Sequence, residues 1–174
     1  MLTNPRMQCH RFLTRNHATS IRLNLSVKAA CSLLTPQSTQ GKLCCRMLSV
    51  GVDMVEVQRI RRALEDSRIG KRFRERVFTA KEIQYCESKR RGRYESYAGR
   101  FAAKEAVMKA LGRGWGAKVC WLDIEVARAR SGKPEIILHD KTARLAEELG
   151  IHRWSLSITH TEDHGLAYVI GQDQ

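Results

Sequence analysis

The first candidate for chemistry is a single carboxylate, Asp53, in the segment Gly51-Val-Asp53 near the start of an apolar run. Removing an ionised carboxylate from water is costly unless a cation or hydrogen bonds compensate it. Asp53 is therefore either a ligand for a cation or a residue near a strand end that accepts backbone hydrogen bonds. The segment alone leaves both alternatives open.

A second carboxylate, Glu105, lies in the segment Arg100-Phe-Ala-Ala-Lys-Glu-Ala-Val-Met-Lys-Ala-Leu-Gly-Arg-Gly114. At helical spacing, Glu105 falls beside an apolar stripe and one turn before Lys109. This position suits a half-buried cation ligand, although an ordinary salt bridge with Lys109 is the alternative. Gly112 and Gly114 follow the helix: one glycine suits a helix C-cap, and two allow the backbone to approach a ligand.

The third candidate is His160, in the segment Ser157-Ile-Thr-His-Thr161 at the end of an alternating strand. A histidine can donate to a phosphate or accept a proton near neutral pH. A purely structural role for this histidine is the alternative.

The elements that must position these residues alternate between helix and strand. Residues 48–57 are apolar on both faces, which predicts a buried strand. The segment Thr79-Ala-Lys-Glu82 has the form of a capping box and predicts a helix start. We expect an α+β fold, with helices over 57–66, 79–88, 97–111 and from Asp140 to about 150, further strands over 122–129, 135–139, 155–160 and 166–170, and loops around Gly70 and over 89–93.

The charge of the chain is unevenly distributed. The formal net charge is +13, and residues 1–46 contain seven Lys and Arg but no Asp or Glu. We expect residues 1–46 to be an extension that adds little to the core, either an overcalled start upstream of Met47, an organelle transit segment or a functional arm. Residues 47–174 then form one domain, with a basic stretch at 59–100 that attracts phosphates or acidic proteins.

Composition excludes several classes of protein. No apolar run is long enough for a membrane span. The six cysteines include no C-x-x-C pair, so zinc-site spacing is absent and reduced thiols in a cytosol-like compartment are expected. A nucleic-acid-binding module is disfavoured because aromatic residues are only 6% of the chain and are not interleaved with the basic cluster. A metal-dependent phosphohydrolase, the second rival, would usually need more metal ligands.

Together, these motifs resemble the holo-acyl-carrier-protein synthases, the small trimeric branch of the 4′-phosphopantetheinyl transferases. The resemblance rests on Gly51-x-Asp53, on Arg100 to Gly114, on Gly132-Lys-Pro134 and on Ser157 to Thr161, in that order across residues 47–174. It implies a single domain with one long central helix against an antiparallel sheet. Two positions depart from the family pattern: Ser49 stands where glycine is frequent, and Arg113 where threonine is common.

The resemblance also implies an activity: transfer of 4′-phosphopantetheine from coenzyme A to a serine of apo-acyl carrier protein, for fatty acid biosynthesis. Asp53 and Glu105 would bind Mg²⁺, with Mn²⁺ as an alternative, and Lys109 and His160 would stabilise the pyrophosphate. Either a metal-held water or one of the carboxylates would be the general base. The residues implied for the coenzyme A site are Arg100, Lys104, Lys109, Gly112, Gly114, Lys133, Pro134, His160 and Thr161.

The implied partners are an acidic acyl carrier protein and two further copies of the chain, with the active site between subunits. The basic stretch from Arg59 to Arg76 offers a docking face for the carrier protein. We expect no nucleic acid and no membrane among the partners. The expected location is the cytoplasm, or an organelle matrix if residues 1–46 are a transit segment.

Overall fold

The computed structural model describes residues 48–173. The extension expected at residues 1–46 lies outside this range. The helices and strands, in chain order, are β1 (Leu48–Glu56), α2 (Val57–Glu65), α3 (Gly70–Val77), α4 (Ala80–Ser88), the short 3₁₀ helix η2 (Arg90–Gly92), α5 (Arg93–Ala110), β2 (Ile124–Arg128), β3 (Pro134–Leu138), α6 (Asp140–Glu148), β4 (Arg153–His160) and β5 (His164–Gln172).

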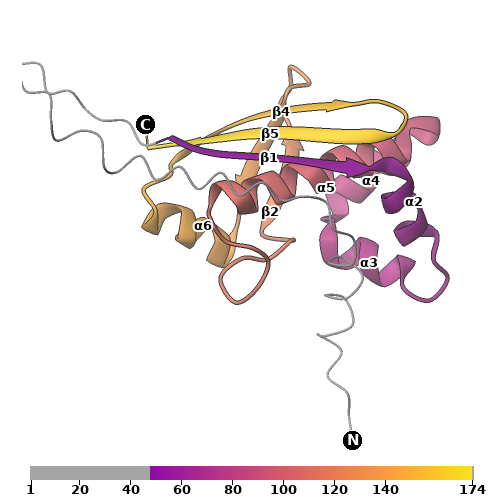
Figure 1. The fold of residues 1–174 in the computed structure, drawn as a ribbon, viewed down its shortest axis with the longest axis horizontal. Coiled ribbons are helices and arrows are strands. Elements are labelled where there is room, and N and C mark those ends of the chain that lie inside the picture. Colours follow the sequence, from indigo (N-terminus) through magenta and orange to yellow (C-terminus); the bar gives the residue numbers. More distant parts are fainter. Residues whose placement is uncertain (1–47, 174) are drawn as a thin grey trace, which may run out of the picture. The chain divides into compact units, whose positions relative to one another are not determined.

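An antiparallel sheet with the strand order β1-β5-β4 packs one face against α5, the long central helix (Figure 1). Ala167 of β5 pairs with Asp53 on one side and with Ile158 on the other, so these three residues share a face. Burial of Tyr97, Phe101 and other large side chains of α5 contributes about 2 kcal/mol each. The α+β class and the central helix against an antiparallel sheet are confirmed.

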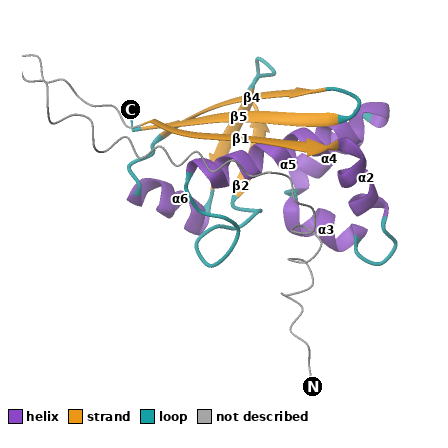
Figure 2. Cartoon of the chain, viewed as in Figure 1, coloured by secondary structure: helices purple, strands orange, loops and turns teal. Residues whose placement is uncertain are grey.

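A second, two-stranded sheet of β2 and β3 lies beside the first, because β3 contacts β4 (Figure 2). Helices α2 and α4 pack against α5, and α4 also contacts β2. The space between α4, α5 and β2 becomes important for the site below. No helix among residues 48–173 is long and apolar enough to cross a membrane.

Strand β1 is buried on one face and open on the other. Gly51 and Val55 face α5 and are buried, whereas Leu48, Val50 and Met54 are 62%, 51% and 61% exposed. The expectation that both faces of this strand are covered is therefore wrong for the single chain. Among residues 48–173 the sheet has one helix layer over it, so within this part of the chain the outer apolar residues of this edge strand stay uncovered.

The local helix signals were accurate where a cap or a stop residue marks the boundary. Thr79 and Glu82 form the expected reciprocal capping box at the start of α4. Helix α3 was missed, because Ile69 provides no side-chain cap and the helix is stabilised instead by the buried Phe73 and Val77. Helix α6 starts at the expected Asp140, and its N-cap is His139, whose side chain makes no capping hydrogen bond.

Candidate active site

Asp53 is held against the central helix by a close approach of β1 to α5. Gly51 permits this approach, because a β-carbon there would lie 1.8 Å from the Ala106 carbonyl oxygen. Two residues earlier, the Ser49 hydroxyl donates to the Ala110 carbonyl oxygen. Alternate residues of a strand share a face, so Asp53 also lies on the helix side of β1, with its side chain 16% exposed.

Glu105 directly precedes Ala106 on α5, and its carboxyl lies within electrostatic range of Asp53. Burial raises the pKa of Glu105 to about 7, and the negative charge of Asp53 adds to this rise. Burial also raises the pKa of Asp53, although the hydrogen bond from Lys109 opposes this rise. Both carboxylates are therefore costly to ionise, and a bound cation would relieve this cost.

Lys109 is the cation that this chain itself brings to Asp53. Its ammonium donates to Asp53 Oδ1 at 2.8 Å and to the Val52 carbonyl oxygen at 2.9 Å. Lys109 lies one turn after Glu105 and lowers the pKa of that carboxyl through its charge. The three residues Asp53, Glu105 and Lys109 thus form one cluster, which we call the Asp53–Glu105–Lys109 cluster.

Helix α5 ends just after Lys109, in a turn that contains Gly112. Gly112 has a φ of +64° and closes the helix in a Schellman motif. In this motif the N–H of Gly112 donates to the Lys109 carbonyl oxygen and that of Arg113 to the Met108 carbonyl oxygen, both at 3.0 Å. Gly114 follows in an exposed loop, where a β-carbon would meet no atom within 4 Å. The expected glycine at the helix end is confirmed, one residue after the C-cap Leu111.

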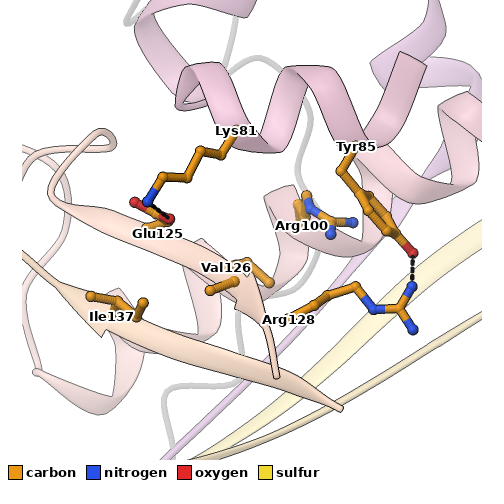
Figure 3. A pocket seen from close by; sticks show the side chains of 8 residues that line it. Lys81, Tyr85, Arg100, Glu125, Val126, Arg128 and Ile137 are labelled. Atoms are coloured by element: carbon orange, nitrogen blue, oxygen red, sulfur yellow. Dashed lines mark hydrogen bonds and ion pairs between the residues drawn. The ribbon is translucent and has the colours of Figure 1, made fainter. Parts of the chain in front are cut away.

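Arg100 lies in a different place, in a cavity of about 260 Å³ between α4, α5 and β2 (Figure 3). Its guanidinium carbon lies 3.9 Å from the centre of the Tyr85 ring. Its Nε is buried without a hydrogen-bond partner among the described residues. A guanidinium with one such donor is suited to an anion such as a phosphate. The cavity is lined by Lys81, Tyr85, Arg100, Glu125, Val126, Ala127, Arg128 and Ile137.

Lys104 is completely buried beside this cavity. Its ammonium pairs with Glu82 Oε2 at 2.8 Å and donates to the carbonyl oxygens of Val77 and Trp121 at 2.7 and 3.0 Å. These contacts give Lys104 a structural role. Its implied place in the coenzyme A site stays a prediction that this packing does not favour.

His160 and Thr161 lie at the far end of the sheet, where β4 turns into β5. His160 is exposed and pairs in register with Gly165. A β-carbon on Gly165 would lie 2.8 Å from the Gly99 nitrogen, so this end of the sheet touches α5 just before Arg100. The Thr161 hydroxyl accepts the N–H of His164 at 3.1 Å and closes the turn.

Lys133 and Pro134 lie at the hairpin between β2 and β3. Pro134 pairs with Arg128, whose side chain lines the Arg100 cavity. The Arg128 guanidinium donates to the Tyr85 hydroxyl at 2.7 Å. The hairpin therefore lies beside the Arg100 cavity and not beside the Asp53–Glu105–Lys109 cluster.

Comparison with known proteins identifies the family. Residues 49–169 match the family model described as the 4′-phosphopantetheinyl transferase superfamily. The chain belongs to this superfamily. It is 51% identical over 124 residues to the holo-[acyl-carrier-protein] synthase of Solibacter usitatus, covering 71% of this chain and 97% of that relative.

Solved structures of 4′-phosphopantetheinyl transferases match the fold as well. The holo-[acyl-carrier-protein] synthase of Neisseria meningitidis is 34% identical with a TM-score of 0.63, covering 71% of this chain and 96% of that one. The Helicobacter pylori enzyme, in complex with coenzyme A, is 32% identical with a TM-score of 0.61, covering 70% and 98%. The resemblance to holo-acyl-carrier-protein synthase is thus confirmed.

Within this 4′-phosphopantetheinyl transferase chain, the implied site residues fall into two groups. Asp53, Glu105 and Lys109 lie toward the C-terminal half of α5, whereas Arg100 and His160 lie toward its N-terminal half. Arg100 lies five positions before Glu105 and nine before Lys109, which is about 7 and 13 Å along a helix axis. Asp53 and His160 also lie on the two opposite edge strands of the sheet. The chain alone does not bring the two groups together.

Sequence reasoning missed several residues around Arg100. Tyr85 and Arg128 had no motif to mark them, and their contacts with each other span 43 positions of sequence. Glu82 was expected as a capping residue, and it does cap α4, but its pairing with Lys104 carried no signal. Helical spacing on α5 shows only that Lys104 and Glu105 point in different directions.

Proposed function

We propose that this chain transfers the 4′-phosphopantetheine of coenzyme A to a serine of an apo-acyl carrier protein, releasing adenosine 3′,5′-bisphosphate in support of fatty acid biosynthesis. The proposal rests on the close approach of Asp53 to Glu105 and Lys109. It rests equally on the similarity of the chain to proteins named holo-[acyl-carrier-protein] synthase. The complex of the Helicobacter pylori enzyme with coenzyme A supports the choice of donor.

The two carboxylates of the Asp53–Glu105–Lys109 cluster fit a Mg²⁺ ion, or Mn²⁺ in its place. Hard divalent cations prefer carboxylate oxygens, and Mg²⁺ commonly takes one or two carboxylates together with phosphate oxygens and water. Burial and the charge of Asp53 raise the pKa of Glu105 to about 7 although Lys109 and Arg59 oppose this rise, so a further cation would favour the ionised pair. Among residues 48–173 no group of three or more His, Cys, Asp and Glu side chains could hold a metal. When bound, the ion would neutralise charge that develops on the transferred phosphate.

The other residues would bind and orient the substrates. Lys109 can reach a pyrophosphate from the exposed end of its side chain, and the loop containing Gly112 and Gly114 permits close approach of a ligand. His160 would donate to a phosphate oxygen. Arg100, with its unused Nε, would pair with a phosphate at the nucleotide end, bounded by Lys133, Pro134 and Thr161. The attacking hydroxyl comes from the carrier protein, so the chain needs no nucleophile of its own.

A homotrimer would unite the two groups of residues. The open apolar face of β1, extended by Tyr168 of β5, is suited to pack around a three-fold axis against two further copies of the chain. One copy would then bring its Arg100 and His160 to the Asp53–Glu105–Lys109 cluster of its neighbour. Val50→Lys should yield a monomer in analytical ultracentrifugation that keeps its circular dichroism and loses transfer activity. A wild-type assembly, or a fully active monomer, would contradict this arrangement.

The acidic carrier protein would dock on the neighbouring helices α2 and α3. Arg62 and Arg72 are exposed there, and Arg61 and Arg74 also form ion pairs with Glu65 and Glu87. Reversal of Arg72 and Arg76 to Glu should raise the KM for the carrier protein by about tenfold and leave coenzyme A binding unchanged. Arg144→Glu on α6 is the matched control. Unchanged kinetics in the double reversal would remove this docking face.

The direct test incubates the protein with coenzyme A, Mg²⁺ and an apo-acyl carrier protein, and then weighs the carrier protein by mass spectrometry. The expected result is a gain of one phosphopantetheine group. Asp53→Asn and Glu105→Gln should abolish the gain, whereas Glu56→Gln, which removes an exposed carboxylate from the same strand, should not. Phosphate release without carrier protein would instead favour a phosphohydrolase. The expected cytoplasmic location stays a prediction.

A further inference from the structure

The two lysines of α5 nearest to Glu105 are held in opposite ways. Lys104 is completely buried and has three partners from other parts of the fold. Lys109 is 45% exposed, and both of its partners, Val52 and Asp53, belong to β1. Because its side chain is flexible and borders solvent, Lys109 can leave these partners without disturbing the core.

The position of the Lys109 ammonium conflicts with a metal ion on the same carboxylate. The ammonium lies 2.8 Å from Asp53 Oδ1, which is also a candidate metal ligand. Two cations that share one carboxylate repel each other. Each also neutralises the negative charge that would otherwise attract the other. A metal ion bound to Asp53 and Glu105 would therefore weaken the contact between Lys109 and Asp53.

We propose, on the basis of the function proposed above, that Lys109 alternates between two anions. The Lys109 ammonium pairs with Asp53 while coenzyme A is absent. It moves to the pyrophosphate of coenzyme A when this ligand enters together with the metal ion. Lys109 then opposes metal binding in the free protein and supports coenzyme A binding in the loaded one. The two ligands are thereby coupled, and each raises the affinity for the other by the same factor.

The size of the effect follows from the exposure of the pair. A partly exposed ion pair such as that of Lys109 and Asp53 weakens a competing binding equilibrium, here that of the metal ion, by up to about fivefold. Removal of the ammonium also removes its direct repulsion of the metal ion. Lys109→Met should therefore tighten the binding of Mn²⁺ to the protein without coenzyme A by about threefold to tenfold. The same variant should bind coenzyme A more weakly, so the coupling between the two ligands should shrink.

The experiment measures Mn²⁺ binding to the full chain by isothermal titration calorimetry at one fixed pH, with and without saturating coenzyme A and without carrier protein. Lys118→Met is the matched control, because it makes the same change at an exposed lysine that pairs with Glu148 at 3.8 Å, away from β1. Its Mn²⁺ affinity should stay as in the wild type. Lys109→Arg keeps the cation and should keep the weak metal binding of the wild type.

Equal or weaker Mn²⁺ binding by Lys109→Met in the absence of coenzyme A would overturn the proposal. Asp53→Asn separates this failure from a failure of the proposed function. If the wild type binds Mn²⁺ and Asp53→Asn does not, the metal site stands and only the exchange by Lys109 is refuted. If the wild type binds no Mn²⁺ even with coenzyme A, both the metal site and the exchange are refuted.

Discussion

The buried ion pair of Lys104 and Glu82 leads to a sharp prediction about stability. Lys104→Met keeps the length of the side chain but removes its charge and its donors. The Glu82 carboxylate would remain fully buried, and the donors left to it among the described residues would be the N–H groups of Thr79 and Val126. The carbonyl oxygen of Val77, one of two that accept from Lys104, would also lose that donor. Because a buried charge is left uncompensated, we expect a loss of about 3–5 kcal/mol in the free energy of unfolding.

The double variant Lys104→Met/Glu82→Gln tests the cause of this loss. It removes the uncompensated charge and keeps one of the two acceptor oxygens at residue 82, so it should be about 1–2 kcal/mol more stable than Lys104→Met alone. The assay is urea unfolding of the full chain followed by circular dichroism at neutral pH. A loss below about 1 kcal/mol in the single variant would refute the reasoning, as would two additive losses in the double variant. A folded Lys104→Met protein with weakened coenzyme A binding would instead support a ligand-binding role for Lys104.

Three further predictions concern the frame of the site. Gly51→Ala should destabilise the protein by at least about 2 kcal/mol in urea unfolding, because its β-carbon would collide with the Ala106 carbonyl oxygen; an unchanged midpoint would contradict this close approach. Gly112→Ala should cost about 1 kcal/mol in the same assay, because a φ of +64° strains any residue with a β-carbon. Burial raises the pKa of Glu105 to about 7 in the folded state, whereas the unfolded state releases this proton near the ordinary pKa of 4.5, so the metal-free protein should lose stability as pH rises through this window. Glu105→Gln should remove that loss and unfold at a higher temperature than the wild type at pH above about 7 in EDTA, and an identical pH profile for both proteins would refute the raised pKa.

Local signals predicted much of the frame. The capping box at Thr79, the glycine at the end of α5 (Gly112) and the alternation before His160 each depend on neighbours within a few residues, and all three occur as expected. Helix α3 depends instead on tertiary packing of Phe73, which no local cap announces. The faces of β1 could not be assigned, because the sequence does not show how many layers cover a sheet.

The sequence named candidate site residues but not their arrangement. The family resemblance implied roles for Asp53, Glu105 and Lys109, and the structure brings these three together, while their roles stay a prediction. The same motifs gave no indication that Lys104 points into the core toward Glu82. They also did not reveal that Tyr85 would lie against the Arg100 guanidinium, because such contacts depend on the relative placement of α4 and α5.

The separation of Arg100 from Lys109 along α5 has a genetic consequence if neighbouring copies complete each other's sites. A lesion at Asp53 and a lesion at Arg100 would then damage different sides of the same interface. Chains carrying one lesion each could complement one another when they assemble together, with about a quarter of the interfaces intact in an equal mixture. Neither parent would be active by itself, so the unit of catalysis would be the contact between two chains and not the folded chain.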